Sequence, residues 1–300
     1  MAEQDAPLAP GLYLVATPIG NLNDITLRAL DILRRADRIA CEDTRQTQKL
    51  LNHFQIATPT ESLHEHNERE RAASLVASLQ SGDRIAVVSD AGMPGISDPG
   101  MALTSAAIAA GVPVIPIPGA NAALSALVAS GLPTEEFQYL GFLPEKAGQR
   151  RTRIEALAAA ASDFPRTLIF YEAPHRILDT LADLEAVFGA RLHIVVAREL
   201  TKIHEEFLRG SVSDVRTQMA SRDRVRGEIT LLVQAPARSH LAADPAIAAA
   251  SIAERVVRLQ SEFSIDEKEA LKRLARELNR SKSDIYRELQ RERAVRGKRH

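Results

Sequence analysis

The sequence predicts an α/β protein with two units built around β-sheets and a small helical domain at the carboxyl end. Short apolar runs alternate with helical patterns through the first half of the 300-residue chain. This alternation is typical of a mostly parallel sheet that is covered by helices on both faces. Strand-like runs with fewer helices follow, and the final part contains helical patterns alone. We therefore expect domains at residues 1–120, 121–235 and 246–300.

Four apolar runs rich in β-branched residues predict the strands of the first domain. They are Gly11–Ala16, Arg38–Glu42, Arg84–Ser89 and Val112–Ile117. The stretch from Pro99 to Thr134 holds no charged residue and is long enough to cross a bilayer. Its prolines and glycines break it into short pieces, which predicts a buried helix, a strand, a turn and a second buried helix instead.

The second domain is expected to be a mixed α+β unit. Its strand-like runs are Phe137–Phe142, Thr167–Tyr171, Leu192–Ala197, Glu206–Arg209 and Glu228–Val233. A linker with two prolines at Ala235–Pro245 leads to three helical patterns. These patterns cover Ile247–Gln260, Ile265–Leu278 and Ser281–Arg291. A tight turn with a serine N-cap at Leu278–Ser283 gives the last two the spacing of a helix-turn-helix.

The composition is that of a soluble globular protein, with 45% hydrophobic and 26% charged residues. The single cysteine, Cys41, excludes an internal disulfide, and we expect no secretory leader, so the cytoplasm is the predicted compartment. The net charge is only −1, but residues 271–300 contain eleven Lys or Arg against four Asp or Glu. The chain therefore ends in a basic segment on an otherwise balanced protein.

Loops with unusual composition follow several predicted strands of the first domain. They are Asp43–Arg45, Ser89–Gly95 and Pro118–Asn121. Open parallel sheets bind ligands outside the carboxyl ends of their strands, where such loops gather. The second loop continues to Gly100, and its three glycines and two prolines exceed what a plain connection needs. Asp90 can accept hydrogen bonds from a ribose or an ammonium group, so we expect a ligand-binding loop.

Two further segments allow more than one interpretation. The segment Phe170–Arg176 follows a buried strand, and there Glu172 or His175 could take a proton. Arg176 could hold a phosphate. Alternatively, Glu172 and Arg176 form an i,i+4 pair at the start of a helix. The segment Thr17–Asn21 is either a phosphate or cofactor loop or a plain turn.

Other kinds of site are disfavoured. Thr17–Asn21 is not a GxGxxG motif, which argues against a nicotinamide cofactor, and no Walker motif, Ser elbow or Cys–His pair stands out. His64 and His66 have no third ligand at a recognisable spacing. We therefore expect no metal site there, and a solvated loop or a substrate contact instead.

Five segments, in order along the chain, together resemble the tetrapyrrole methylase family, and within it the bacterial branch that methylates small-subunit ribosomal RNA. They are Ala16–Leu22, Cys41–Arg45, Ser89–Gly100, Pro118–Asn121 and Phe170–Arg176. The resemblance runs from about Leu12 to Val233. The C-terminal helices also resemble the helix-turn-helix tail of that branch.

The resemblance implies a two-domain fold that holds S-adenosylmethionine in the cleft between the domains, in a homodimer. The family's cofactor contacts, transferred residue by residue, fall on ten positions. These are Pro18, Gly20, Ser89, Asp90, Met93, Asn121, Ala122, Glu172, Leu200 and Ile229. The common family pattern has a glycine in place of Ser89 and a Gly-Asp pair in place of Ile19–Asn21. Both departures fit the ribosomal RNA branch and argue against a corrin or sirohaem-precursor substrate.

The reaction that the resemblance implies is methyl transfer from a sulfonium to the ribose 2′-hydroxyl of a cytidine in 16S ribosomal RNA. Alignment of nucleophile, methyl and sulfur supplies much of the acceleration. A base must still help to remove the hydroxyl proton. Asp43, Glu172 and His175 are candidate bases, and the choice among them stays open. Arg45 and Arg176 are better suited to bind phosphate.

The basic tail is expected to bind RNA of the small (30S) ribosomal subunit through backbone phosphates. The residues concerned are Lys272, Arg273, Arg276, Arg280, Lys282 and Arg287. The alternative is a basic helix face that is merely solvated. Two other functions stay open for the whole chain. One is a methyltransferase of the same fold that acts on a tetrapyrrole precursor or a modified protein residue, and the other is a ligand-sensing regulator that binds DNA.

Overall fold

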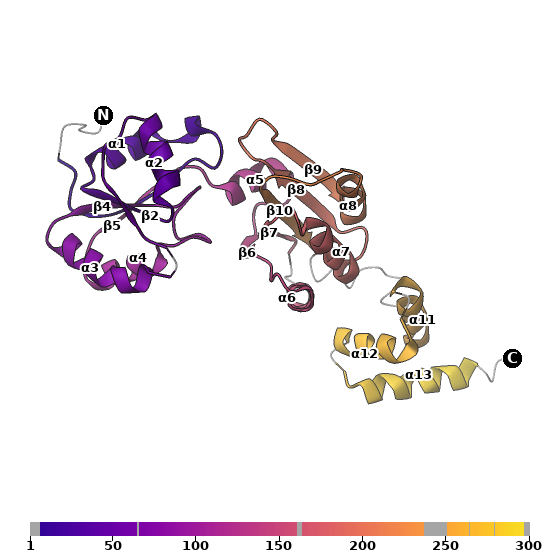
Figure 1. Ribbon diagram of the computed structural model, residues 1–300. Helices are drawn as coiled ribbons and strands as arrows, with labels where there is room; N and C mark the ends of the chain where they lie inside the picture. Colours follow the sequence, from indigo (N-terminus) through magenta and orange to yellow (C-terminus); the bar gives the residue numbers. More distant parts are fainter. Residues whose placement is uncertain are drawn as a thin grey trace.

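The computed structural model describes residues 7–64, 66–160, 164–236, 251–263, 265–278 and 280–296. Within these ranges the chain forms two units, each with a five-stranded sheet, followed by three helices (Figure 1). This arrangement confirms the predicted α/β fold class. Among the described residues, no helix has the length and apolar character that a membrane span requires.

The first unit is a parallel sheet with helices on both faces. Its elements are β1 (Gly11–Val15), the 3-10 helix η1 (Leu22–Asp24), α1 (Leu27–Arg35), β2 (Arg38–Cys41), α2 (Thr44–His53), β3 (Thr60–Ser62), α3 (Glu68–Gln80), β4 (Arg84–Val88), α4 (Met101–Ala109) and β5 (Val114–Ile117). The strands are ordered β3-β2-β4-β1-β5, and each neighbouring pair is parallel. The carboxyl ends of all five strands therefore lie at one edge of the sheet.

The side chains of β4 explain why helices cover both faces of this sheet. Ile85 and Val87 pack into a core that includes α3 and α4. Ala86 and Val88 pack into a second core that includes α1 and α2. Successive side chains of a strand point to opposite faces, so a strand that is apolar throughout must be covered on both sides.

The least regular strands lie at the two edges of this sheet. The sequence does not predict β3, because its three residues are too few to show an alternation of apolar and polar side chains. At the opposite edge, β5 contains Pro116, which has no backbone N–H to donate. An edge strand tolerates such a residue because one of its sides has no partner strand.

The second unit is built on a mixed sheet. Its elements are α5 (Ala122–Ser130), β6 (Phe137–Phe142), α6 (Ala147–Ala159), β7 (Arg166–Glu172), α7 (Ile177–Phe188), β8 (His193–Arg198), β9 (Glu206–Ser211), α8 (Val212–Ala220) and β10 (Ile229–Ala235). The strand order is β6-β7-β10-β8-β9, with β6 parallel to β7 and the other pairs antiparallel. Phe170 and Leu231 face the core with α6, α7 and α8, whereas Ile169 and Leu232 face α5.

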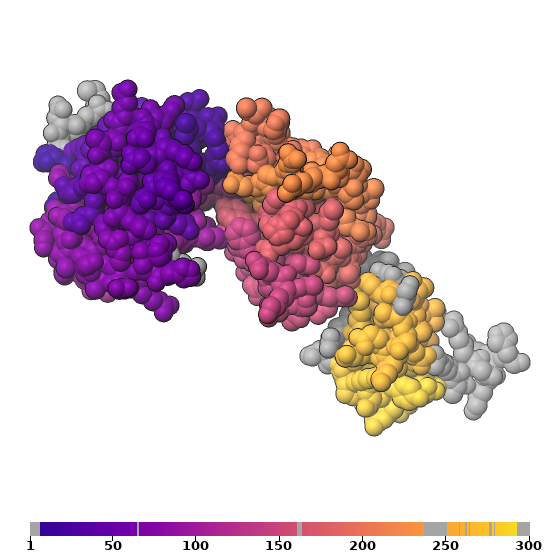
Figure 2. All heavy atoms as spheres, viewed as in Figure 1, coloured from indigo at the N-terminus to yellow at the C-terminus, as the bar shows by residue number. Residues whose placement is uncertain are grey.

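The two units share an apolar contact at the helix α5. This helix follows β5 in the chain but packs against the second sheet, so the chain crosses between the units at residues 118–121. Ile19 of the first unit also belongs to the core beneath α5 and is 8% exposed. The space-filling view shows the two units in contact along one boundary (Figure 2).

The three C-terminal helices have a core of their own. They are α11 (Ile252–Phe263), α12 (Glu267–Glu277) and α13 (Lys282–Arg296). Val256 and Ile285 are fully buried where the helices pack together. Ser281 caps α13, its hydroxyl accepting a hydrogen bond from the Asp284 amide at 3.1 Å. Residues 237–250, which hold most of the predicted linker and the start of the first predicted helix, lie outside the described residues.

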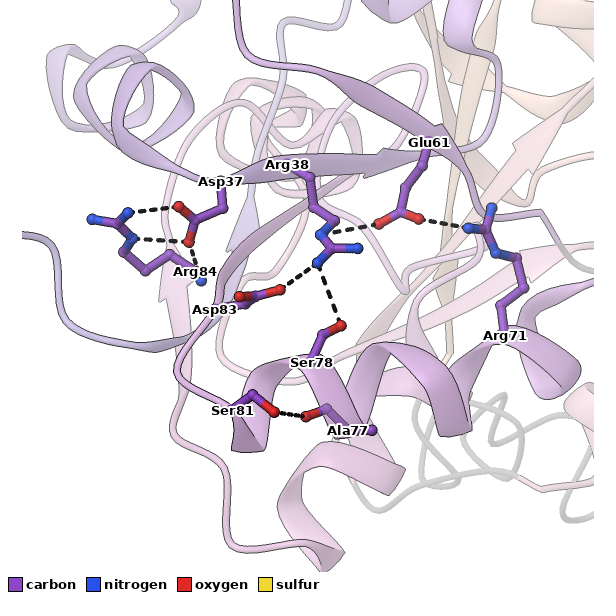
Figure 3. A network of polar contacts seen from close by, with 9 residues as sticks. All are labelled: Asp37, Arg38, Glu61, Arg71, Ala77, Ser78, Ser81, Asp83 and Arg84. Atoms are coloured by element: carbon purple, nitrogen blue, oxygen red, sulfur yellow. Dashed lines mark hydrogen bonds and ion pairs between the residues drawn. The ribbon is translucent and has the colours of Figure 1, made fainter.

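A network of ion pairs lies at the amino ends of β2 and β4 (Figure 3). Two hydrogen bonds of 2.6 and 3.0 Å join the Arg84 guanidinium to the Asp37 carboxylate. Arg38 donates to Asp83, and its Nε lies 3.8 Å from the nearer carboxylate oxygen of Glu61. Because these charges lie at the end of the sheet opposite the loops of unusual composition, we assign them to stability.

Glu206 joins three segments of the second unit. Its carboxylate accepts hydrogen bonds from Arg222, which follows α8, at 2.6 and 2.8 Å, and from Arg198 of β8 at 3.0 Å. These bonds, those from Arg222 above all, hold the pKa of Glu206 at about 2, below its ordinary value of 4.5. The folded state therefore favours the ionised carboxylate.

We predict that Glu206→Gln lowers the free energy of unfolding by about 1–3 kcal/mol at pH 7, because two guanidinium groups lose their counter-charge. The folded-state pKa is depressed, so this contribution is fully present above pH 4.5 and is lost as the pH falls towards 2. Urea unfolding at a series of pH values measures it. The gap between variant and wild type should close on acidification, and the exposed Glu145→Gln serves as the control. A gap that does not change with pH would contradict the prediction.

Candidate functional site

A cavity of about 390 Å³ lies at the junction of the two units. Its walls come from the loop after β4, the start of α5, the ends of β7 and β8, and the start of β10. Cavities that bind small molecules usually enclose ~300–1,000 Å³. Because the carboxyl ends of the parallel strands meet here, this is the place at which an open α/β sheet binds a ligand.

The loop between β4 and α4, residues 89–100, forms one wall and has an unusual backbone. Gly92, Gly95 and Gly100 have φ angles of 82°, 81° and 127°, and Ser97 has a φ of 60°. Glycine adopts this left-handed region at little cost, whereas a serine there is strained. The backbone of the loop therefore requires these glycines, and strain is stored next to Asp98.

Hydrogen bonds hold this loop at both ends. Thr17, which follows β1, exchanges two backbone hydrogen bonds with Gly92 at 2.9 and 3.0 Å. At the other end, the buried carboxylate of Glu68 in α3 accepts from the amides of Gly100 and Leu103 at 3.1 and 3.0 Å. Glu68 thus caps α4 from a different helix, and the conformation of the loop depends on elements on both sides of it.

Seven of the ten residues predicted to contact a cofactor line the cavity. They are Asp90, Met93, Asn121, Ala122, Glu172, Leu200 and Ile229. Asn121 is also the N-cap of α5, since its side-chain oxygen accepts from the Leu124 amide at 2.9 Å. Folding brings these seven together from both units.

The other three predicted cofactor residues, Pro18, Gly20 and Ser89, do not line the cavity. Ser89 is buried, and its hydroxyl donates to the Gly92 carbonyl at 3.3 Å. A Cβ added to Gly20 would lie 2.5 Å from the Lys202 side chain, so this glycine lets the first loop approach the second unit. Pro18 is buried as well. These residues shape the loops behind the wall, and their contact with a cofactor stays a prediction.

Glu172 and Arg176 form the helix pair that was the alternative to a catalytic role. The Glu172 side chain is fully buried and accepts hydrogen bonds from Arg176 and from Thr180 at 2.7 Å. It also accepts from the Ala173 amide at 2.8 Å, and Arg176 donates further to the Leu143 carbonyl at 3.2 Å. Three donors therefore occupy the oxygens of Glu172, and the guanidinium of the buried Arg176 is engaged by Glu172 and by the Leu143 carbonyl.

Asp43, Arg45 and His175 do not line the cavity either. Asp43 caps α2 and accepts from the Arg45 guanidinium at 2.8 and 3.1 Å. The hydrogen bonds from Arg45 hold the pKa of Asp43 at about 2, which makes it a weak proton acceptor at neutral pH. The side chain of Arg45 is 87% exposed, and His175 is exposed. Arg45 and His175 therefore do not belong to the cavity wall. The exposed Arg45 can still bind a phosphate outside the cavity.

Asp98 lines the cavity, and the sequence does not single it out. Its pKa is raised to about 6, first by burial and then by the nearby carboxylates of Glu42 and Asp90. Titratable groups with shifted pKa values in a cavity are typical of functional sites. The sequence does show Asp98 as a second acid in the loop that contains Asp90. The prediction of a ligand-binding loop depends on the glycines and prolines and on Asp90, and not on this second acid.

The charges of the cavity wall have one sign. Its acidic residues are Asp90, Asp98, Glu172 and Glu228, whereas no Lys or Arg is among the described residues that line it. Arg176 neutralises Glu172 from behind the wall. Such a wall favours a ligand that carries positive charge, because the carboxylates attract it. It disfavours a ligand with phosphates, because the carboxylates repel them.

Several predicted RNA-binding residues of the C-terminal unit are exposed but take part in local ion pairs. Lys272 lies 3.6 Å from Glu269, Arg280 lies 2.6 Å from Glu288, and Arg287 lies 3.5 Å from Asp284. Arg273 stacks over the ring of Phe263, with 3.8 Å from Cζ to the ring centroid. Arg276 belongs to α12, but its side chain lies outside what the structure describes.

Three lysines nevertheless gather around one hollow between α12 and α13. They are Lys268, Lys272 and the exposed Lys282, and the acidic Asp266 and Glu269 share the hollow with them. Lys268 was not among the predicted RNA contacts. Lysines that meet at one hollow form a compact basic surface, which the order of residues along the chain does not show.

The histidines at positions 64 and 66 have ring centroids 6.0 Å apart, and Glu65 between them lies outside the described residues. In the part of the chain that the structure describes, no three His, Cys, Asp or Glu side chains are grouped as metal ligands would be.

Comparison with known proteins gives consistent matches. Residues 11–216 match the family described as tetrapyrrole (corrin/porphyrin) methylases. A protein of Halalkalibacterium halodurans named ribosomal RNA small subunit methyltransferase I is 55% identical over 223 residues, 74% of this chain and 75% of that one. A protein of Mesorhizobium japonicum with the same name is 49% identical over 227 residues, 76% of each chain.

Solved structures share the fold. A uroporphyrin-III C-methyltransferase from Thermus thermophilus, complexed with S-adenyl homocysteine, superposes with a TM-score of 0.51 at 18% identity. The superposition covers 75% of this chain and 97% of that one. At this identity the likeness concerns the fold of the two sheet-containing units.

We predict that Glu172→Gln lowers the free energy of unfolding by about 3–5 kcal/mol, because the variant leaves the buried Arg176 cation without a counter-charge. The matched control is Glu155→Gln, which breaks an exposed ion pair with Arg151 and should cost no more than about 0.5 kcal/mol. Denaturant unfolding of both variants measures the two losses. Equal stability of the Glu172 variant and the wild type would contradict the structural role.

Proposed function

This chain belongs to the tetrapyrrole (corrin/porphyrin) methylase family, and on that premise we propose that it transfers a methyl group from S-adenosylmethionine to 16S ribosomal RNA. The acceptor that we propose is the ribose 2′-hydroxyl of a cytidine. One observation carries the proposal: a cavity lined by acids, without Lys or Arg among its described residues, lies at the strand ends of this fold.

The cavity suits S-adenosylmethionine in size and in charge. This molecule carries a sulfonium and an ammonium group, for which the Asp90 and Asp98 carboxylates supply the opposite charge. Ile19, Met93 and Leu200 add apolar wall that an adenine ring can pack against. The residues that we propose to hold the ligand are Asp90, Met93, Asn121, Ala122, Leu200 and Ile229. When bound, it supplies a methyl group that the sulfonium has already activated.

Two observations support ribosomal RNA as the acceptor. Relatives about half identical to this chain over three quarters of its length are named as small-subunit ribosomal RNA methyltransferases. The C-terminal unit adds a hollow with three lysines, and phosphate contacts of this kind supply much of the affinity of proteins for nucleic acids. The Thermus uroporphyrin enzyme is far less similar, so a tetrapyrrole acceptor has weaker support.

Within this proposal the two units that share the cavity hold the methyl donor, and the helical unit contributes affinity for the subunit. A homodimer and a cytoplasmic location remain predictions from the resemblance and the composition. Light scattering of the purified chain tests whether it forms a homodimer.

We predict that the purified chain transfers labelled methyl from S-adenosylmethionine to 16S ribosomal RNA, or to 30S subunits, from cells that lack this protein. Mass spectrometry of nuclease digests should place the label on one cytidine and on its ribose rather than its base. RNA from cells that contain the protein is the control and should accept little label. Transfer to a porphyrinogen and not to RNA would contradict the proposal. Duplex DNA binding without formation of S-adenosylhomocysteine would favour the regulator instead.

We also predict that replacing Lys268, Lys272 and Lys282 by glutamine weakens RNA binding without changing cofactor affinity. The slope of log affinity against log salt concentration should become less negative by about 2–3, since each phosphate contact contributes nearly one unit to this slope. Fluorescence anisotropy with 16S RNA fragments and calorimetry with S-adenosylhomocysteine give the two readouts. The matched control replaces three exposed arginines of the second unit, Arg153, Arg191 and Arg224. An equal effect of the control would show that general charge, rather than this surface, binds RNA.

A further inference from the structure

We propose that Phe142 binds the base of the target nucleotide, which stacks on the exposed face of its ring at the cavity wall. This inference rests on the proposed function and deepens it, because it names the group that holds the acceptor rather than the methyl donor. The site consists of Phe142 and of the two tyrosines that support it, Tyr139 and Tyr171. Its ligand is the base of an unpaired nucleotide of the RNA.

Aromatic side chains are scarce in this chain, yet three of them gather at one side of the cavity. The chain has eight Phe, four Tyr and no Trp. The ring centroids of Tyr139 and Tyr171 lie 5.1 Å apart, and those of Phe142 and Tyr171 lie 5.8 Å apart. Phe142 and Tyr171 both line the cavity. Proteins bind unpaired bases by stacking them on aromatic rings, so this cluster suits a nucleotide as the acceptor.

The three rings differ in exposure, and this difference makes Phe142 the contact surface. Tyr139 and Tyr171 are half-buried and pack against the core beneath α5. Phe142 keeps 55% of its surface exposed. Its ring meets that of Tyr171 at an interplanar angle of 65°, and such a contact uses the edge of one ring and one face of the other. At least one face of the Phe142 ring therefore stays free of Tyr171.

A bulge in β6 turns Phe142 towards the cavity. Between Tyr139 and Phe142, β6 contains one residue more than the stretch of β7 with which it pairs. In a regular strand Phe142 would share a face with Leu140, which packs into the core with α6, α7 and α8. The extra residue instead places Phe142 beside Tyr171 and puts Leu143 into that core. β-bulges next to active sites re-aim a side chain in this way.

Gly141 permits the bulge and lets it approach the loop between β4 and α4. Its φ of 65° lies in the region that glycine adopts at little cost. A Cβ added to Gly141 would lie 3.3 Å from the Ser97 hydroxyl oxygen, which itself lies 2.6 Å from the Tyr139 hydroxyl. These contacts fix the aromatic rings relative to the loop that carries Asp90 and Asp98, the acids that we propose to face the methyl donor.

The charge of the cavity wall determines which part of a nucleotide can approach it. The carboxylates repel phosphates, so the RNA backbone must stay outside the cavity. An uncharged base does not meet this repulsion, and every base has a face that can stack on an aromatic ring. A nucleotide turned out of the RNA helix can place its base on Phe142 while its phosphates stay outside. The ribose joins the two, which leaves its 2′-hydroxyl next to the cavity.

The first test compares Phe142→Leu, which removes the aromatic face, with Phe137→Leu. Phe137 is the matched control because it lies at the other end of β6, is 46% exposed and does not line the cavity. We expect Phe142→Leu to lower kcat/KM for 16S RNA by about 5–100-fold, mainly through a higher KM, and Phe137→Leu to leave it unchanged. Phe142→Tyr, which restores a ring, should recover most of the loss. Calorimetry should give the same affinity for S-adenosylhomocysteine in every variant.

The second test measures stacking directly and uses the absence of tryptophan from this chain. Phe142→Trp and Phe137→Trp each introduce a single indole, whose fluorescence is quenched when a base stacks on it. Adding 16S RNA should quench the indole at position 142 much more than the one at position 137, and the second signal corrects for light that the RNA absorbs. S-adenosylhomocysteine alone should leave the fluorescence at position 142 nearly unchanged.

The possible failures of this inference and of the proposed function are distinguishable. Wild-type kcat/KM of Phe142→Leu, in a preparation whose wild type methylates RNA, would overturn this inference alone. Reduced affinity of Phe142→Leu for S-adenosylhomocysteine would also overturn it, because the ring would then contact the methyl donor. Quenching at position 142 by S-adenosylhomocysteine as strong as that by RNA would have the same meaning. A wild type that transfers no methyl group to RNA would instead refute the proposed function, and this site with it.

Discussion

The cavity depends on one short contact, the pair of backbone hydrogen bonds between Thr17 and Gly92. These two residues follow β1 and β4, which are neighbours in the parallel sheet, so the contact closes the two loops over the strand ends. It also fixes the place of Ile19, which enters the core beneath α5 and so joins the first unit to the second. Gly92 has to be a glycine because its backbone turns back at a positive φ to reach Thr17.

Three carboxylates next to the loops at the strand ends maintain the shape of the protein. Glu68 caps a helix other than its own, Glu172 is enclosed with Arg176, and Asp43 caps α2 while it holds Arg45. Each of these carboxylates is needed because the backbone or guanidinium donors around it would otherwise lack a partner. The other carboxylates of the cavity wall, Asp90, Asp98 and Glu228, have fewer donors around them. These less engaged acids give the wall its negative charge.

The helical unit differs from the other two because it has a small core and a surface rich in basic side chains. Many of its apolar side chains form a small core of their own, with Val256, Leu274 and Leu289 at its centre. Its basic side chains therefore remain at the surface, several in weak exposed pairs that a phosphate can replace at little cost. A unit of this kind can add affinity for a large polyanion without altering the cavity between the other two units.

The sequence by itself determined the elements and the loops of this protein. The apolar runs predicted nine of the ten strands that the structure describes in the two sheets, whereas β3, with three residues, is too short to show a pattern. The sequence also singled out the loop that forms one wall of the cavity, because glycines and prolines gather there after a buried strand. Only the tertiary structure decided which charged residues face the cavity. Glu172 ends β7 and Asp98 lies in the loop after β4, but the carboxylate of Glu172 is enclosed by donors from residues 173–180, whereas Asp98 faces the cavity. That difference depends on neighbours distant in the chain, which no local pattern records.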